Sequence, residues 1–327
     1  MKTVHILGAG CSYEDGAPLI NNFVKHLDTQ INRLSEHARY SHFRGILEFK
    51  EKYFDDLNIE DYFSLLDYYI SFGYSFQGYD IIGIRENLKF LIARTLLLAS
   101  NKKSTNYAEY YSSCTTANDT IISLNWDSLL DGVSDDLNYS IGYFRYSSDR
   151  QLKLHQHAGK RPQLLKLHGS VNMFACSKCS FRYLVDHDNA LNLIEQTEKC
   201  HHCNNGEIYM LLIPPTHFKS VDPHLTEVWN CAFGALAECD RIRFIGYSMP
   251  DADIHFQTLL KAALRFKNRS PQIEVFDYKK KHKDRVEFED HYQRIFDKIT
   301  ETNKPIKFHY VEFSKLKNYF DKEYSSI

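Results

Sequence analysis

Four cysteines with chemically informative spacing occur in the middle of this chain. They form two Cys-x-x-Cys pairs, Cys176/Cys179 and Cys200/Cys203, with a spacer of about twenty residues between the pairs. Each short pair directs two thiolates at one ion, and the spacer allows the second pair to complete a tetrahedron. The sequence therefore predicts a structural Zn²⁺ site in a small zinc-ribbon module.

Disulfides are the competing interpretation of these cysteines. The start of the chain carries no long apolar signal peptide, because Lys2 and His5 interrupt it and Gly8 ends the apolar run. This favours a cytoplasmic protein, in which thiols stay reduced. His201 and His202 lie inside the second pair and are alternative ligands, although four cysteines already fill a closed site.

A histidine at the end of an apolar run is the main candidate for acid–base chemistry. The run Leu164–Leu167 predicts a strand, and His168 follows it directly, before a glycine. An imidazole at a strand end reaches into a cleft and exchanges a proton near neutral pH. His168 is therefore predicted to be a catalytic residue.

Two polar side chains follow another predicted strand, Thr120–Leu124. Asn125 and Asp127 offer an amide and a carboxylate two residues apart, suited to a ribose hydroxyl, a carboxamide or a water molecule. The alternative is that they cap the next turn, which applies to Asp127 more than to Asn125.

Two loops of small residues are candidates for binding phosphate groups. Gly8, Ala9, Gly10 and Ser12 follow the predicted strand Thr3–Leu7, and Gly246 and Ser248 follow Arg241–Ile245. Glycines let a backbone approach a pyrophosphate, and amides at a helix start bind it. Glycine turns also follow strands in many other folds. Asp277, after the predicted strand Ile273–Phe276, fits a ribose hydroxyl or a solvated turn equally well.

These candidates require a fold that gathers the ends of several strands. Short apolar strands alternate with amphipathic helical stretches, and a last strand is predicted near Ile306–Val311. This alternation predicts an α/β protein with a doubly wound, Rossmann-type parallel sheet, in which ligands bind at the carboxyl ends of the strands. We expect the apolar run Ile208–Ile213 to resume this alternation after the cysteines.

The predicted domains follow from these elements. Residues 1–172 and 211–327 form the Rossmann-type domain, with a helical insert at about 40–115, and residues 173–210 form the zinc-ribbon module. The insert is rich in tyrosine and phenylalanine between Tyr62 and Tyr79, and at this density most aromatic side chains are expected in the core.

Composition restricts the functional classes. The chain has 327 residues, 43% of them hydrophobic, and a net charge of −2, which describes a folded, soluble protein without general affinity for nucleic acid. The basic run Lys279–Lys283 is too short to change that balance. The most apolar stretch, Phe90–Ala99, is too short to cross a membrane.

Taken in order, these motifs resemble the sirtuin superfamily of NAD-dependent enzymes. The order is Gly-Ala-Gly-x-Ser, Asn-x-Asp, Leu-His-Gly, paired cysteines and Gly-x-Ser. The resemblance implies that Gly8, Ala9, Gly10, Ser12, Gly246 and Ser248 contact the NAD phosphates, that Asn125 and Asp127 lie beside the nicotinamide and its ribose, and that His168 is the base. It also implies zinc on the four cysteines and places Asp277 near the adenosine half.

The chain departs from protein-deacylating sirtuins at two places. Their Pro-Asp-Phe-Arg element after the first loop is absent, and their Phe-Gly-Glu strand corresponds to residues 212–217, which contain Pro214 and Pro215. Prolines remove amide donors that would hold a peptide by β-augmentation. The chain is more similar to divergent bacterial sirtuin-like proteins, several of which hydrolyse NAD in antiphage defence.

We therefore predict an NAD glycohydrolase, with NAD as substrate and Zn²⁺ as a structural ion. A protein deacylase or ADP-ribosyltransferase and a non-catalytic NAD or ADP-ribose sensor are the alternatives. The expected ligand is NAD, and a regulatory protein or a phage-derived trigger is a possible partner. The chain is a candidate for forming a homo-oligomer. We expect no binding to membranes and no direct binding to nucleic acid.

Overall fold

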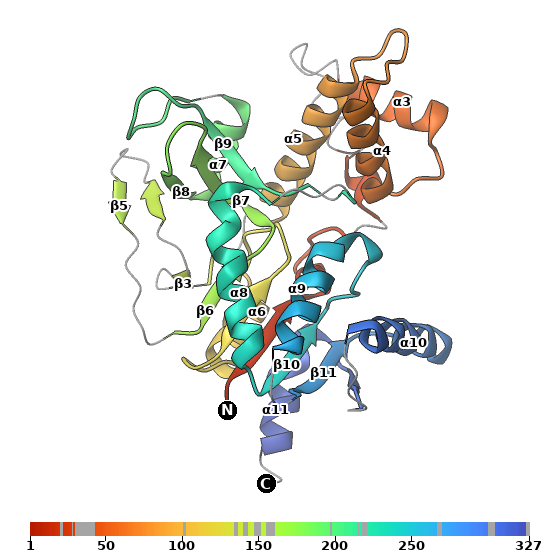
Figure 1. Ribbon diagram of the computed structural model, residues 1–327, viewed down its shortest axis with the longest axis vertical. Helices are drawn as coiled ribbons and strands as arrows, with labels where there is room; N and C mark the ends of the chain where they lie inside the picture. The colour runs from red at the N-terminus through yellow and green to blue at the C-terminus, as the bar shows by residue number, and fades with distance from the viewer. Residues whose placement is uncertain are drawn as a thin grey trace.

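The computed structural model describes residues 1–19, 22–27, 29, 43–100, 103–133, 137–139, 143–146, 152–154, 161–196, 198–214, 216–217, 221–266, 270–299 and 305–324. In this part of the chain two sheets form, each covered by helices (Figure 1). The sequence favours loop or surface positions for His155 and His157, and these two residues and Pro215 lie outside the described residues.

The large sheet is parallel throughout. Its order is β12-β11-β10-β1-β2-β6-β3. The strands are β1 (Thr3–Leu7), β2 (Thr120–Ser123), β3 (Asn138–Tyr139), β6 (Gln163–Lys166), β10 (Arg241–Ile245), β11 (Gln272–Asp277) and β12 (Lys307–Tyr310). The predicted parallel sheet is confirmed. The short strand β3 was not predicted, since two residues leave no apolar pattern.

Helices cover both faces of this sheet. Neighbouring residues of a strand point to opposite faces. The ring of Phe244 in β10 packs on Tyr292 and Phe296 of α10, whereas the guanidinium of Arg243 lies 4.2 Å from the ring centre of Phe320 in α11. The helices are α6 (Thr105–Ser113), α8 (Thr226–Glu238), α9 (Ile254–Arg265), α10 (His282–Ile299) and α11 (Leu316–Tyr324).

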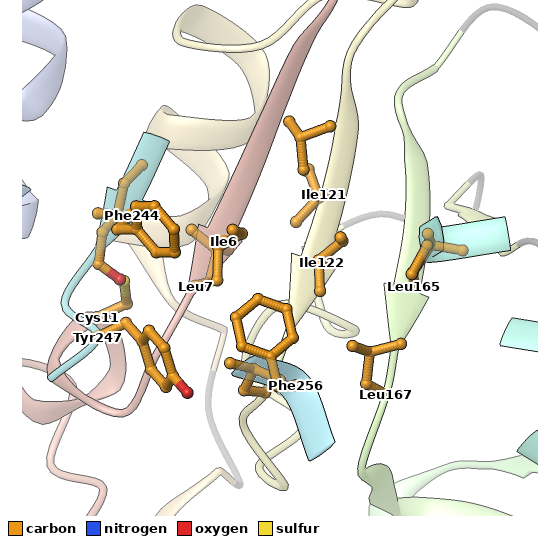
Figure 2. Packing of buried hydrophobic residues seen from close by; sticks show 14 of the residues in the cluster. Ile6, Leu7, Cys11, Ile121, Ile122, Leu165, Leu167, Phe244, Tyr247 and Phe256 are labelled. Carbon is orange, nitrogen blue, oxygen red and sulfur yellow. The ribbon is translucent and has the colours of Figure 1, made fainter. Parts of the chain in front are cut away.

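The core of this region is apolar and continuous. Figure 2 shows buried side chains from β1, β2 and β6, with Phe256 of α9 among them. Short 3₁₀ turns join the elements at η2 (Pro223–Leu225), η3 (Asp251–Asp253) and η4 (Phe313–Lys315). We call the large sheet and its helices the large lobe.

The second sheet has the order β5-β4-β8-β7-β9. Its strands are β4 (Phe144–Tyr146), β5 (Leu152–Leu154), β7 (Gly169–Cys176), β8 (Arg182–Val185) and β9 (Ile208–Leu212). Because β9 pairs antiparallel with β7, the expectation that Ile208–Ile213 resumes the parallel alternation is wrong. An apolar run does not encode which sheet it joins.

The first three helices of the predicted insert pack with this second sheet, whereas its last helix, α6, packs in the core of the large sheet. These three are α3 (Arg44–Tyr53), α4 (Ile59–Phe72) and α5 (Ile81–Ala99), and α5 contacts both β7 and α7 (His187–Glu195). Asn58 caps α4 by accepting from two backbone amides, and Asp80 caps α5. These helices, α7 and the second sheet share one core, and we call them the small lobe (Figure 1).

Strand β7 belongs to both cores. Met173 and Ala175 lie in the core of the large lobe, whereas Phe174 and Cys176 lie in that of the small lobe. The second sheet therefore lies between the two cores. Its strands span residues 144–154 and 169–212, a wider range than 173–210, and the predicted domain boundaries stay predictions.

The aromatic residues between Tyr62 and Tyr79 differ in burial. Tyr62 and Phe63 are fully buried, whereas Phe72 and Tyr74 are 65% and 55% exposed. Tyr69, Phe76 and Tyr79 are partly buried and pack against the same core. The expectation that most of these aromatic residues lie in the core therefore holds for Tyr62 and Phe63 as fully buried residues and for these three as its edge. Among the described residues, no helix has the length and apolarity needed to cross a membrane.

Candidate functional site

The strand ends that carry the candidate residues meet at one edge of the large sheet. Leu7 pairs with Ser123 and with Ile245, and Ser123 pairs with Lys166. The residues that follow these positions therefore emerge side by side. This register brings together the loops that begin at Gly8, Leu124, Leu167 and Gly246, as expected for the carboxyl ends of parallel strands.

The two glycine loops touch each other through their backbones. The amide of Gly10 donates to the carbonyl of Gly246 (2.8 Å), and a Cβ atom on Gly8 would lie 2.6 Å from that same oxygen. Gly246 also has a positive φ of 57°, which only glycine adopts readily. Close packing of the loops thus explains the glycines without a ligand. The helix after the first loop, α1 (Gly10–Tyr13), is a single turn.

Ser12, Asn125 and Asp127 form one buried hydrogen-bonded cluster. The Ser12 hydroxyl donates to Asp127 Oδ2 (2.7 Å), and Asn125 Nδ2 donates to Ser12 Oγ (3.1 Å) and to the Gly8 carbonyl (2.9 Å). Tyr107 of α6 joins them, with its hydroxyl 2.8 Å from Ser12 Oγ. The structure thus links the first loop directly to the polar pair after β2.

Asp127 has two environments at once. Its Oδ1 accepts from the Leu129 amide (3.1 Å), which is the turn cap considered as the alternative. Burial raises the pKa of its carboxyl group, and the charge of Lys166 and the Ser12 hydrogen bond act in the opposite direction. Asp127 therefore both caps a turn and takes part in the polar cluster.

Lys166 is a buried cation directly behind this cluster. Its Nζ lies 2.7 Å from Asp131 Oδ2 and donates to the Asp127 carbonyl (2.6 Å) and to Ser170 Oγ (2.9 Å). The hydroxyl of Tyr139 also donates to Asp131. These bonds tie the loop after β2 to the start of β7.

His168 lies next to the cluster and is almost completely buried. Its Nδ1 donates to the Leu124 carbonyl (3.3 Å), and its Nε2 lies 3.8 Å from Asp253 Oδ1. The glycine that follows is required by its surroundings. Gly169 has a φ of 69°, and a Cβ atom there would lie 1.8 Å from the carbonyl oxygen of Leu211.

Two predicted contact residues have surroundings that differ from those of this cluster. Ser248 is exposed. Asp277 accepts from the amide of its neighbour Tyr278 (2.6 Å) and lies 3.3 Å from Lys279 Nζ. The structure thus gives Asp277 the contacts of a turn, and its role in binding adenosine stays a prediction.

Three residues of the site were not predicted from the sequence. Tyr107 lies on α6 in the predicted insert and leaves no local signal. Lys166 was not predicted as a site residue because it lies within an apolar run that indicated only a strand. Asp253 follows the second glycine loop in the sequence Pro250-Asp251-Ala252-Asp253, and an acid there could have been considered for the same reason as Asp127.

The four predicted zinc ligands gather in the small lobe. The sulfur atoms lie within 4.8 Å of one another, with 3.6 Å between Cys176 and Cys203 and 3.7 Å between Cys179 and Cys200. A tetrahedron of sulfur atoms about 2.3 Å from zinc has edges of about 3.8 Å. A disulfide would need about 2.05 Å. The geometry therefore fits one zinc ion held by four thiolates and not disulfides.

In the segment after β9, the backbone amides of Ile213, Thr216 and His217 donate hydrogen bonds within the protein. The Ile213 amide donates to the His168 carbonyl (2.9 Å), that of Thr216 to the Pro214 carbonyl (3.0 Å), and that of His217 to Ser64 Oγ of α4 (2.8 Å). Pro214 has no amide hydrogen. This segment is therefore held against His168 and α4.

Comparisons with known proteins relate part of this chain to the Sir2 family. Residues 151–251 match the sequence model of the Sir2 family, a segment that includes His168, the four cysteines, Gly246 and Ser248. No curated protein sequence matches the chain. The segment that matches the Sir2 family model, residues 151–251, is less than half of the chain.

Sirtuins are among the solved structures that are similar to this chain. One is described as Sir2Tm bound to a propionylated peptide (14% identity, covering 99% of this chain and 93% of that chain, TM-score 0.48). Another is described as a Sir2, p53 peptide and NAD⁺ complex (14% identity, 99% and 94%, TM-score 0.48). The fold assignment here rests on the strand order and register.

Proposed function

We propose that this protein is a sirtuin-like NAD glycohydrolase that converts NAD⁺ and water to nicotinamide and ADP-ribose. The observation that carries the proposal is the convergence of Ser12, Asn125, Asp127 and His168 at one edge of the large sheet. The Sir2 match over residues 151–251 supports NAD as the ligand of this edge.

The chemistry assigned to His168 follows from its hydrogen bond to the main chain. A carbonyl oxygen only accepts, so the bond to Leu124 keeps the proton on Nδ1 and leaves Nε2 as the basic nitrogen. In the reaction the bond between ribose C1′ and nicotinamide N1 breaks, and nicotinamide leaves with the electron pair. Water oxygen bonds to C1′, and its proton passes to Nε2, directly or through a ribose hydroxyl.

The other residues would orient the reactants. Asn125 Nδ2 donates hydrogen bonds to Ser12 and Gly8. The Oδ1 atom of Asn125 would therefore accept a hydrogen bond from the attacking water. Asp127 would hold the nicotinamide carboxamide. Gly8, Ala9, Gly10, Gly246 and Ser248 would contact the phosphates. Holding ribose and water in place lowers the barrier without a covalent intermediate.

The segment after β9 favours water over a peptide as the acceptor. A peptide bound by β-augmentation needs free amide donors along an edge. Here the amides of Ile213, Thr216 and His217 donate within the protein. This is the observation that ranks hydrolysis above protein deacylation.

Biological setting is part of the proposal. We infer a cytoplasmic role in bacterial antiphage defence, in which a partner protein, a phage-derived trigger or self-assembly controls the consumption of NAD. The four-thiolate site leaves no coordination position for water or substrate, so the zinc ion would support the fold and take no part in the chemistry.

The decisive experiment measures nicotinamide and ADP-ribose release from NAD⁺ by purified protein, with and without candidate activators. Wild type is expected to release both without a peptide. His168→Ala and Asn125→Ala should each lower kcat by about 10²–10⁴-fold. The control is His282→Ala, because His282 is an exposed residue at the start of α10.

Each alternative gives a different result in this assay. Release that depends strictly on an acyl-lysine peptide or an acceptor protein indicates a transferase or deacylase. Tight NAD binding without turnover under every condition indicates a sensor. Full activity of either variant contradicts the mechanism.

A further inference from the structure

His168 faces a buried carboxylate that comes from a distant part of the chain. The distance between His168 Nε2 and Asp253 Oδ1 is 3.8 Å, and the two side chains are 4% and 8% exposed. This separation is too long for a direct hydrogen bond. It is short enough for a strong interaction between opposite charges in a site with little water.

The second glycine loop holds Asp253 in this position. The Tyr247 hydroxyl donates to Asp253 Oδ2 (2.8 Å), and the Tyr292 hydroxyl of α10 donates to the Tyr247 carbonyl. His291 Nε2 donates to the Met249 carbonyl (2.9 Å). Two side chains of helix α10 therefore hold the second glycine loop through hydrogen bonds to its carbonyl groups.

The backbone of this loop is itself unusual. Met249 has a φ of 53° although it is not glycine, and its side chain is fully buried. Such a conformation costs of order 1–3 kcal/mol and persists where the surroundings impose it, often at functional sites. The turn that follows it, η3, delivers Asp253 to His168.

We propose that Asp253 is the positioning residue for His168: its carboxylate orients the imidazole and stabilises the positive charge that the ring gains on accepting a proton. The proposal rests on the proposed role of His168 as base. The bond from Nδ1 to Leu124 directs Nε2 toward Asp253, so the proton arrives on the nitrogen beside the carboxylate.

Other charged groups near His168 are engaged elsewhere. Asp127 accepts from Ser12 and from the Leu129 amide. Lys166, the last residue of β6 and two residues before His168, is paired with Asp131. Asp253 is therefore the group whose charge is placed to respond to protonation of the ring.

The test compares Asp253→Asn with the matched control Asp251→Asn, which lies in the same 3₁₀ turn but is exposed. Two quantities are measured: the titration of His168 by NMR, with its signal assigned by its loss in His168→Ala, and the pH profile of NAD⁺ hydrolysis. In Asp253→Asn the pKa of His168 should fall, because the imidazolium loses its counter-charge.

The same variant should lower kcat at least about tenfold and move the acid limb of the pH profile to lower pH by about one unit or more. Asp251→Asn should leave both quantities unchanged. A merely structural role for Asp253 would lower kcat without moving the pH profile or the NMR titration.

The outcomes separate this proposal from the proposed function. If the protein does not hydrolyse NAD but the His168 titration moves in Asp253→Asn, the positioning role stands and the function is wrong. Hydrolysis with an unchanged profile and titration overturns the positioning role alone. If Asp253→Asn does not fold, Tyr247→Phe decides, because it releases one carboxylate oxygen, and a kcat within about twofold of wild type overturns the proposal.

Discussion

The two lobes are stabilised by different interactions. The large lobe buries charged and polar groups at the carboxyl edge of its sheet, among them Asp127, Lys166, His168 and Asp253, each engaged with a neighbouring polar group. The small lobe buries aromatic and aliphatic side chains and gathers four thiols. The comparison places the residues of the proposed site in the large lobe and the proposed zinc site in the small lobe.

The lobes meet at the main chain around His168. The Ile213 amide donates to the His168 carbonyl (2.9 Å), and the Val171 amide donates to the Trp126 carbonyl (2.9 Å). Strand β7 begins at Gly169, one residue after the proposed base. A disturbance of the small lobe is therefore expected to reach the site through these bonds.

The largest effect is expected from Cys179→Ser. Zinc binding to small modules releases about 10–16 kcal/mol, much of it used for folding, and the variant removes one of four ligands. Wild type should contain about one zinc ion per chain, and the variant should contain none. Hydrogen exchange should show residues 43–99 and 169–212 opening while the strands of the large sheet stay protected.

The control for this prediction is Cys231→Ser, because Cys231 lies on α8 away from the thiol cluster. It should keep the zinc content and the exchange pattern of wild type. A zinc-free wild-type protein, prepared under reducing conditions, that folds and turns over NAD normally would contradict the assignment. Equal loss of protection in both lobes would contradict their separation.

An intermediate effect is expected from Lys166→Met. The variant leaves Asp131 as a buried carboxylate without its cation, which costs about 3–5 kcal/mol. The free energy of unfolding, measured by denaturant titration, should fall by that amount. Because Lys166 also holds the Asp127 carbonyl, kcat should fall as well.

The double variant Lys166→Met, Asp131→Leu is the matched control. Removing both charges leaves no unpaired ion, so part of the lost stability should return. If Lys166→Met alone is as stable as wild type, Lys166 is not the electrostatic support of this loop.

The smallest effect is expected from Tyr107→Phe. The change removes the hydroxyl that contacts Ser12 and Asn125 and keeps the ring, so stability should fall by about 1 kcal/mol. A modest fall in kcat, with unchanged zinc content, would place Tyr107 as a support for the cluster. The control is Tyr79→Phe, because Tyr79 packs against the core of the small lobe. This variant should leave kcat unchanged.

The sequence was sufficient to predict the strands of the large sheet other than the two-residue strand β3. Runs such as Arg241–Ile245 and Thr3–Leu7 are rich in apolar and β-branched residues and end before a glycine, and the structure has strands with those same bounds. A parallel sheet then places its strand ends at one edge whatever the details of packing. The cysteine spacing likewise predicted a site that the sulfur distances fit.

What the sequence determined by itself was thus local: strand positions, the glycine loops, the order of polar strand ends and the paired cysteines. Only the tertiary structure decided that β9 joins β7, that Tyr107 joins Ser12 and that Asp253 faces His168. The reason is physical, since residues 95 positions apart, as in Ser12 and Tyr107, meet through the packing of whole elements. Hydrophobic periodicity specifies which face of an element is buried but carries no information about the partner it is buried against.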